Sequence, residues 1–180
     1  MTIRRPVIRA KAQELLARNG VKHAPVPVEQ IAQAIGVEIT RTDTQDDLSG
    51  FLLRDGSRGR NVIGVNASHS PTRQRFTVAH ELGHFMLHQG EPIHVDGVGS
   101  YRIERRSSKS SQGDEPNEIE ANMFAAELLM PEEFLRKDLE NGVEPVDLSG
   151  DEDIGRLAAK YQVSTTAMTF RLANLRFIRL

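Results

Sequence analysis

The stretch from residue 70 to residue 90, SPTRQRFTVAHELGHFMLHQG, constrains the fold of this chain more than any other. Ser70 is a good N-cap, Pro71 suits the first turn of an α-helix, and Gly90 is a natural stop. Apolar residues recur along it at helical spacing: Phe76, Ala79, Leu82, Gly83 and Met86. The stretch therefore predicts one helix from Ser70 to Gly90 that buries one face.

The motif HELGH lies inside this helix, with His80, Glu81 and His84 at its defining positions. Residues four apart stand above one another, roughly 6 Å along the axis, so two imidazoles can converge on one Zn²⁺ at about 2.1 Å each. Glu81 projects beside them, where it can take a proton from a metal-bound water. The alternative, a solvated helix with two surface histidines, is disfavoured by the apolar flanks. The motif thus predicts His80 and His84 as metal ligands and Glu81 as the catalytic base.

A hydrolytic zinc site needs a third protein ligand and one open position. The metzincin pattern would place a histidine at position 90, where this chain has glycine. His88 continues the ladder of histidines, but a straight helix puts it about 12 Å along the axis from His80, too far to share one metal ion. We expect His88 to end the helix or to contact its last carbonyl groups.

The segment 116–130, PNEIEANMFAAELLM, is predicted to be a second helix that supplies the third ligand. Its apolar positions are Ile119, Phe124, Leu128 and Leu129. Glu118 and Asn122 are spaced i, i+4, so both can face the metal, and Asn122 can orient a ligand histidine from there. Glu120 competes with Glu118 but lies about 200° round the helix, so at most one of the two faces the metal. We favour Glu118 and expect Glu120 to be a solvated carboxylate.

The two motifs together, FTVAHELGHFMLH and EIEANMFAAELLMP, resemble the ImmA/IrrE metallo-endopeptidases of bacteria, their phages and mobile elements, over most of the chain. The resemblance implies a zincin-like fold and a gluzincin-type zinc site of two histidines and one glutamate. It also implies cleavage of a helix-turn-helix repressor, which derepresses an operon in a stress, DNA-damage, phage-defence or mobile-element response. Its functional positions match His80, Glu81, His84, Glu118 and Asn122. We expect the repressor to be a second polypeptide, encoded by a neighbouring gene.

Composition narrows the remaining choices. The 180 residues include no cysteine, which excludes disulfides, thiolate ligands and cysteine nucleophiles. The net charge of −2 gives no general attraction to nucleic acid or membranes. No apolar run approaches eighteen residues, and no signal peptide is recognisable, so we expect a cytoplasmic protein without a membrane partner. The predicted class is α+β, with a zincin-like core over residues 1–142 and a helical appendage over residues 143–180.

Two helices and three strands are predicted before the metal helix. The helices cover residues 4–20, with Val7, Leu15 and Leu16 among the buried positions, and residues 28–36. The strands cover residues 37–42, 49–54 and 61–66. The last two strands flank the turn sequence DGSRGR and should form a hairpin. We therefore expect a small mixed or antiparallel sheet packed on the metal helix.

The strand directly before the metal helix is the candidate for substrate binding. In zinc peptidases an exposed strand above the metal commonly pairs with an extended substrate backbone by strand addition. We expect this edge to consist of Asn61, Val62, Ile63, Gly64, Val65 and Asn66. The alternative is an ordinary hairpin in which the backbone groups of this strand are hydrogen-bonded to neighbouring strands on both sides.

Residues 91–115 join the two metal-binding helices. They contain a short strand candidate, YRIERR, and a polar segment at 107–115 that we expect to lie near the cleft as a lid. Either His94 or Tyr101 can stabilise the oxyanion that forms when a peptide carbonyl is attacked. The plainer interpretation, which we favour for each, gives them no part in catalysis.

The C-terminal part is predicted to form a helix after Met130 and then a helix pair around a turn at Val163, with Ser164 as the second N-cap. The pair has the look of a helix-turn-helix unit. From Ile154 onward there are no acidic residues and five basic ones: Arg156, Lys160, Arg171, Arg176 and Arg179. The apolar character of the second helix favours packing over DNA contact. The alternative function is a non-proteolytic, metal-containing regulatory module that binds DNA or a repressor.

Overall fold

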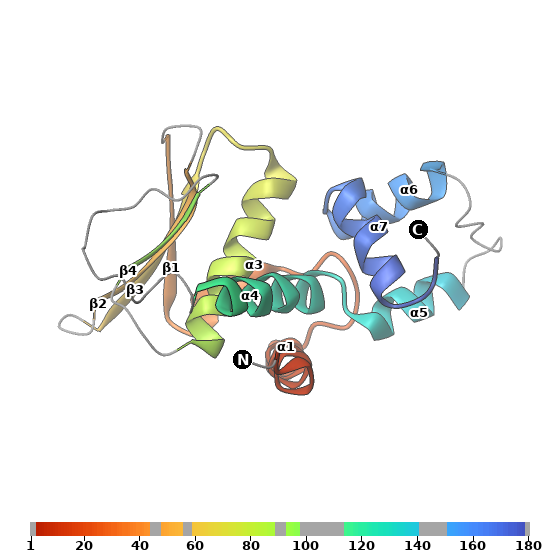
Figure 1. Ribbon diagram of the computed structural model, residues 1–180, viewed down its shortest axis with the longest axis horizontal. Coiled ribbons are helices and arrows are strands. Elements are labelled where there is room, and N and C mark those ends of the chain that lie inside the picture. The colour runs from red at the N-terminus through yellow and green to blue at the C-terminus, as the bar shows by residue number, and fades with distance from the viewer. Residues whose placement is uncertain are drawn as a thin grey trace.

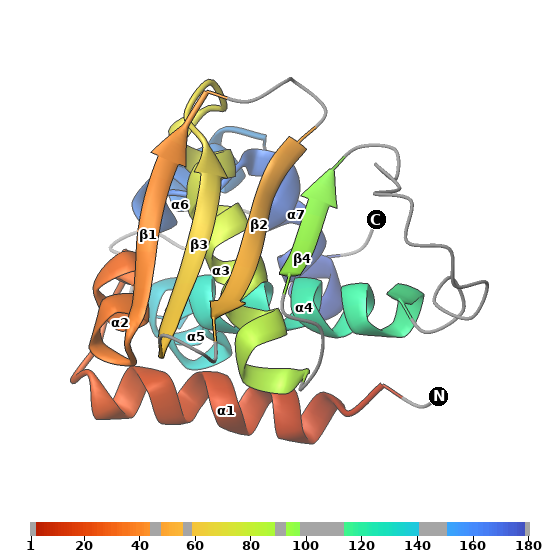
Figure 2. The same ribbon diagram turned by 90° about the vertical axis from the view of Figure 1, so that its left-hand side faces the viewer.

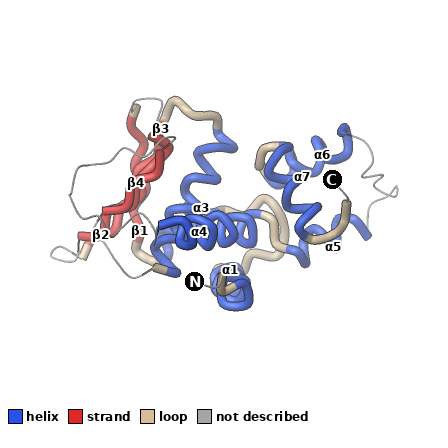
Figure 3. Tube along the Cα trace, in the orientation of Figure 1, coloured by secondary structure: helices blue, strands red, loops and turns tan. Residues whose placement is uncertain are grey.

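The computed structural model describes residues 3–43, 48–55, 59–88, 93–97, 114–140 and 151–178. These residues form a mixed α+β fold in which a four-stranded sheet is one layer and the helices gather on one of its sides (Figures 1 and 3). The metal helix and the second motif helix cross between the sheet and the C-terminal helices. The site residues therefore lie in the middle of the molecule.

The two N-terminal helices are α1 (Arg5–Arg18) and α2 (Val28–Ala34), as the sequence predicted. Helix α1 buries a stripe at helical spacing: Ile8, Ala12, Leu15 and Leu16. Val7 was expected in that stripe but is exposed. Successive residues of a helix point about 100° apart, so Val7 points away from the side on which Ile8 is buried. Gly20 follows α1 with φ +63°, a backbone conformation that glycine adopts without strain.

The sheet has the order β1-β3-β2-β4 (Figure 2). The strands are β1 (Val37–Thr42), β2 (Leu48–Asp55), β3 (Arg60–Asn66) and β4 (Ile93–Gly97). Strand β3 pairs in parallel with β1 and antiparallel with β2, and β4 adds to the other side of β2. The first three strands and their hairpin were predicted, whereas β4 was not. The strand candidate at 101–106 lies outside the described residues.

The expectation that Asn61–Asn66 is an exposed edge is wrong. This segment lies inside the sheet, where Ile63 pairs with Ile39 of β1 on one side and with Leu52 of β2 on the other. The physical reason is that β1 returns parallel to β3 and pairs with it from Val37 to Thr42, so the backbone of β3 is hydrogen-bonded on both sides. Among the described strands, β1 and β4 are the edges.

Helix α3 (Pro71–Leu87) is the predicted metal helix. Ser70 caps it, since its Oγ accepts a hydrogen bond from the backbone N–H of Arg73 at 3.4 Å. The helix ends at Leu87 rather than at Gly90, and His88 is its C-cap with an extended backbone. Position 90 lies outside the described residues.

Helix α4 (Asp114–Leu129) crosses α3 at very short range. A Cβ atom on Gly83 would lie 3.0 Å from the Cα atom and 3.1 Å from the carbonyl oxygen of Ala121, so a larger residue there would need the two helices to move apart. Phe124, Leu128 and Leu129 are buried as predicted, whereas Ile119 is exposed because it lies on the other side of α4. The glycine of the HELGH motif thus sets the distance between the two motif helices.

The C-terminal elements are α5 (Glu132–Glu140), α6 (Asp151–Tyr161) and α7 (Thr165–Asn174). Ser164 caps α7 as predicted, with its Oγ accepting from the N–H of Ala167 at 3.1 Å. Arg171 of α7 reaches back to α4, donating to Glu127 at 2.7 and 2.9 Å. The proposed domain boundary at 142–143 lies outside the described residues. No helix within the described ranges is long and apolar enough to cross a membrane.

We expect Gly83→Ala to destabilise the fold by about 1–3 kcal/mol, because the added methyl group must push the backbone of α4 away. Gly155→Ala in α6 is the matched control, since its added methyl group meets no atom within 4 Å. Alanine is also the better helix former, so the control should be neutral or more stable by up to about 1 kcal/mol. Urea unfolding measures both variants, and equal stability would contradict the close-approach argument.

Candidate metal centre

Three potential metal donors converge where α3 crosses α4. The Nε2 atoms of His80 and His84 lie 3.1 Å apart. The carboxylate of Glu118 meets both, with Oε2 at 3.2 Å from His80 Nε2 and Oε1 at 3.1 Å from His84 Nε2. The two histidines are buried, whereas the side chain of Glu118 is 35% exposed, so the group is open toward solvent on the side of Glu118.

The donor set fits a divalent metal ion. Donors bound at about 2.0–2.1 Å in a tetrahedral arrangement are about 3.3–3.4 Å apart, close to the separations of 3.1 and 3.2 Å found here. Two imidazoles and one carboxylate leave one of four positions for a reactant, as hydrolytic sites require. These three residues form the group capable of holding a metal ion within the described part of the chain.

Asn122 fixes the tautomer of His80. Its Oδ1 lies 3.0 Å from Nδ1 of His80, and an amide oxygen can only accept a hydrogen bond. The Nδ1 atom of His80 therefore carries the proton, and its Nε2 lone pair points at the other donors. Asn122 lies one turn beyond Glu118 on α4, which is the relation that the i, i+4 spacing predicted.

A longer chain of hydrogen bonds fixes the tautomer of His84. Nδ1 of His84 lies 3.1 Å from Nδ1 of His88, and Nε2 of His88 lies 3.2 Å from Oε2 of Glu120. A carboxylate accepts, so His88 donates from Nε2, and a neutral His88 then accepts from His84 at Nδ1. This direction leaves the Nε2 lone pair of His84 free of a proton. Both histidines are thereby held in the form that a metal ion needs.

The expectation that Glu120 is solvated is wrong. Its side chain is 2% exposed and accepts hydrogen bonds from the backbone N–H of Arg4 at 2.9 Å and from Arg4 Nε at 3.0 Å, with a further close contact to Nη2. The guanidinium of Arg4 lowers the pKa of Glu120 to about 2. The carboxylate is covered by the N-terminal segment, because Arg4 and the end of α3 at Leu87 and His88 lie against this part of α4.

Arg54 of β2 supports the end of the metal helix. Its Nη2 donates to the carbonyl oxygens of His84 at 2.7 Å and His88 at 3.0 Å. Burial lowers the pKa of Arg54, and attraction to Glu81, which is fully buried on the metal helix, opposes that shift. Sequence reasoning assigned these carbonyls to His88 and missed Arg54, because no local pattern marks a partner thirty residues away.

The other sequence candidates are not gathered at this centre. His94 lies on β4, whose side chains are outside the described set, and Tyr101 and the segment 107–115 are outside it too. Four of the five C-terminal basic residues are described, and three of these pair within the chain: Arg156 with Asp153, Lys160 with Asp138 and Arg171 with Glu127. Those three positive charges are therefore partly neutralised by the protein itself.

Comparison with known proteins identifies relatives. The family model described as peptidase M78, IrrE N-terminal-like domain, matches residues 32–173. The chain is 30% identical over 147 residues to the radiation response metalloprotease IrrE of Deinococcus radiodurans, covering 75% of this chain and 43% of the relative. It is 29% identical over 163 residues to the protein of the same name from Deinococcus deserti, covering 84% and 54%. The chain thus spans about half the length of these two relatives.

Two further similarities extend this result. The chain is 26% identical over 162 residues to the uncharacterized immunity region protein 2 of Bacillus phage phi105, covering 84% of this chain and 92% of that protein. Its fold resembles that of a Mycobacterium tuberculosis transcriptional regulator, with a TM-score of 0.59, 16% identity, and coverage of 92% of this chain and 46% of the other. At that identity the likeness concerns the fold alone.

Arg4→Met should weaken the fold in a pH-dependent way when measured on metal-free protein. Because Arg4 holds the pKa of Glu120 at about 2, below its ordinary 4.5, the interaction stabilises the folded state fully above about pH 4.5 and is lost toward pH 2. We expect a loss of about 2 kcal/mol at pH 7 that shrinks to zero near pH 2.

Urea unfolding between pH 7 and pH 2 measures this difference. Arg5→Met, at the exposed first position of α1 directly after Arg4, is the control and should stay within about 0.5 kcal/mol of the unsubstituted chain. A loss for Arg4→Met that is the same at every pH would contradict the assignment of Glu120 as its partner.

Proposed function

The chain belongs to the ImmA/IrrE family, and from this membership and the geometry at the α3–α4 crossing we propose that it is a metal-dependent endopeptidase of the gluzincin type. The observation that carries the proposal is the group of His80, His84 and Glu118, with buried Glu81 next to it on α3. A purely structural metal site takes four protein ligands and has no use for an additional buried carboxylate.

The proposed mechanism gives each residue a separate task. His80, His84 and Glu118 would hold the metal ion, which we take to be Zn²⁺ and which, when bound, supplies Lewis acidity to the reactants. Glu81 accepts a proton from the attacking water and passes it to the leaving amine. Asn122 keeps the first of the two histidines in the ligating tautomer, and the bond from His84 to His88 does the same for the second.

An extended peptide is the natural substrate for such a site. Strand β4 forms one edge of the sheet, on the same side of the molecule as the beginning of α4, which carries Glu118 (Figure 2). The substrate strand that we propose is therefore β4, in place of the interior segment Asn61–Asn66. Strand addition there would present the backbone of an extended segment and would exclude packed helices.

The target that we propose is a helix-turn-helix repressor encoded beside this chain and met in the cytoplasm. The names of the relatives, which refer to a radiation response and to a phage immunity region, are consistent with a regulatory target. Cleavage in a linker would separate the DNA-binding part of a repressor from its dimerising part. Operator binding would then weaken strongly, because two half-sites would no longer be tethered. The alternative, a DNA-binding module, is disfavoured by the internal pairing of Arg156, Lys160 and Arg171.

The ligand assignment makes a prediction about metal affinity. Glu118→Ala should lower the affinity for Zn²⁺ by more than about 100-fold, since two histidines alone form an incomplete site, and Asn122→Ala should lower it by about 10–100-fold. Glu133→Ala, on the exposed side of α5, is the control and should bind as the unsubstituted chain does. Competition with a chromophoric chelator measures all three. Unchanged affinity for Zn²⁺ in Glu118→Ala would show that Glu118 is not a metal ligand.

The role of Glu81 makes a prediction about catalysis. Glu81→Gln should keep the fold and the bound metal but slow peptide cleavage by about 10²–10⁴-fold, because the amide cannot accept the proton. The measurement is cleavage of the neighbouring repressor, with mass-spectrometric mapping of new termini, and Glu133→Gln is the control. Turnover retained in Glu81→Gln, or equal digestion of casein and repressor by the unsubstituted chain, would count against the proposal.

A further inference from the structure

His88 stands between a proposed metal ligand and a buried carboxylate. Its ring is hydrogen-bonded to Nδ1 of His84 at 3.1 Å on one side and to Oε2 of Glu120 at 3.2 Å on the other. The side chain of His88 is 12% exposed, so both bonds lie in a largely desolvated place, where hydrogen bonds are strong. His88 is therefore connected to the donor group without being one of its three members.

The backbone of His88 is fixed independently of its ring. Its N–H donates to the carbonyl oxygen of His84 at 3.1 Å, and its own carbonyl oxygen accepts from Nη2 of Arg54 at 3.0 Å. With the backbone held in this way, the ring can still rotate, and its bonds to His84 and Glu120 oppose that rotation. The position of the ring thus depends on whether Glu120 stays in place.

Glu120 is held by the segment that precedes α1. Arg4 donates to its carboxylate from the backbone N–H at 2.9 Å and from Nε at 3.0 Å, and Nη2 of Arg4 makes a further close contact. The side chain of Glu120 is 2% exposed, so water can hardly replace these donors. Without Arg4 the buried charge would lose most of its compensation, and the carboxylate would have to move away from His88 toward solvent.

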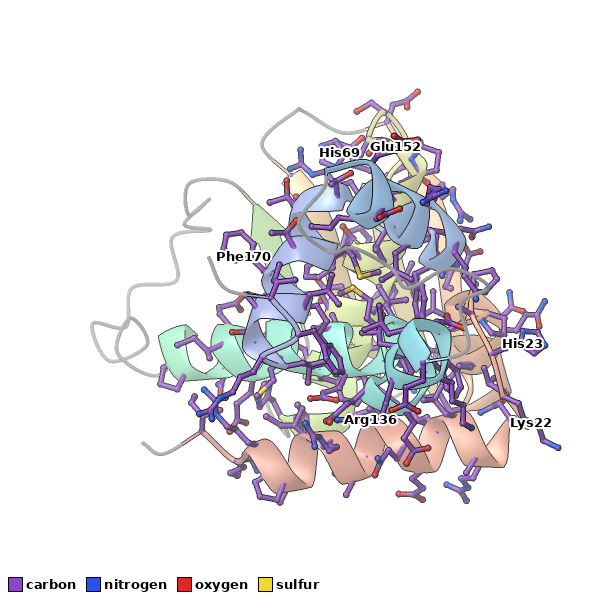
Figure 4. All side chains as sticks on the ribbon, turned by 90° about the vertical axis from the view of Figure 1, so that its right-hand side faces the viewer. Lys22, His23, His69, Arg136, Glu152 and Phe170 are labelled. Carbon is purple, nitrogen blue, oxygen red and sulfur yellow. The ribbon has the colours of Figure 1, made fainter. Side chains whose placement is uncertain are left out.

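Helix α1 runs alongside α4, and both helices begin at the same end of the molecule (Figures 2 and 4). Arg4, just before α1, contacts Glu120, and Arg9, further along α1, contacts Glu127, further along α4. The two arginine side chains are similarly exposed, at 40% and 45%. The carboxylate of Glu120 goes on to a histidine, whereas that of Glu127 goes on to Arg171. Arg9 is therefore a natural control for Arg4.

We propose that His88 is a positioning residue of the metal centre, held by Arg4 through Glu120, so that metal binding and the docking of the segment before α1 are thermodynamically linked. The inference rests on the proposed function and adds a control of metal affinity from outside the motif helices. A ligand ring that is already fixed loses less freedom when the metal ion binds. Linkage is reciprocal, so a bound metal ion strengthens the docking of Arg4 by the same factor.

The first test is the affinity for Zn²⁺, measured by competition with a chromophoric chelator. His88→Phe should lower it by about 10–100-fold, because the ring of His84 loses its partner. Arg4→Met should lower it by at least about fivefold. Arg9→Met breaks a comparable contact between α1 and α4 and should bind Zn²⁺ as the unsubstituted chain does. Equal affinities of Arg4→Met and Arg9→Met would overturn the proposal.

A double-mutant cycle tests the route from Arg4 to the metal centre. If Arg4 acts through His88, the variant that carries both Arg4→Met and His88→Phe should bind Zn²⁺ no more weakly than His88→Phe alone. A general loss of stability would instead lower the affinity of the double variant by the product of the two single effects. Such a product would overturn the route through His88, even with a weakened Arg4→Met variant.

The second test is hydrogen exchange at the backbone N–H of Arg4, which reports directly on the docked segment. Zn²⁺ should slow this exchange by at least about fivefold in the unsubstituted chain and leave it unchanged in His88→Phe. The N–H of Asn19, which donates to Leu15 at the other end of α1, is the reference and should not respond. Exchange at Arg4 that ignores Zn²⁺ in the unsubstituted chain would contradict the linkage.

Neither test involves peptide cleavage, so each separates the positioning from the peptidase. A chain that cleaves no repressor but shows the linked changes would refute the peptidase and uphold the positioning role of His88. An active enzyme in which Arg4→Met keeps full affinity for Zn²⁺ would refute the positioning and leave the peptidase standing. An unsubstituted chain that binds no Zn²⁺ would overturn both.

Discussion

The close contact between Gly83 and Ala121 is the constraint on which the rest of this structure depends. A Cβ atom on Gly83 would lie 3.0 Å from the Cα atom of Ala121, so α3 and α4 pack closely at this point. At the same crossing the carboxylate of Glu118 lies within 3.2 Å of both histidines.

The two histidines are held in their tautomers by contacts of very different sequence range. Asn122 acts within the motif helices, one turn from Glu118, and its position follows from helical periodicity. The bonds from His84 through His88 to Glu120 end at Arg4, which is 116 residues from Glu120 in the sequence. The orientation of His84 is thus coupled to the packing of the N-terminal segment, because Glu120 is hydrogen-bonded to both Arg4 and His88.

Local patterns predicted the elements and residues that depend on local physics. Helical spacing located α3, α4 and the donor group, and turn chemistry located the β2–β3 hairpin. The features that were not predicted depend on contacts between distant parts of the chain. Whether Asn61–Asn66 is an edge depends on where Val37–Thr42 pairs, and the partners of Glu120, Glu127 and Arg54 come from distant parts of the chain. No local pattern in the sequence marks these distant partners.

The family match covers some of the elements that surround the donor group but not all of them. The match begins at residue 32, beyond α1, and ends at residue 173, within the last turn of α7. It therefore includes both motif helices and α7 except its last residue, but not the segment that carries Arg4. Of the basic residues on this helix pair, Arg171 is buried and paired with Glu127 of α4, whereas Arg156 and Lys160 form exposed ion pairs with Asp153 and Asp138. The matched region thus contains the whole donor group, and Arg4 binds Glu120 of that region from outside it.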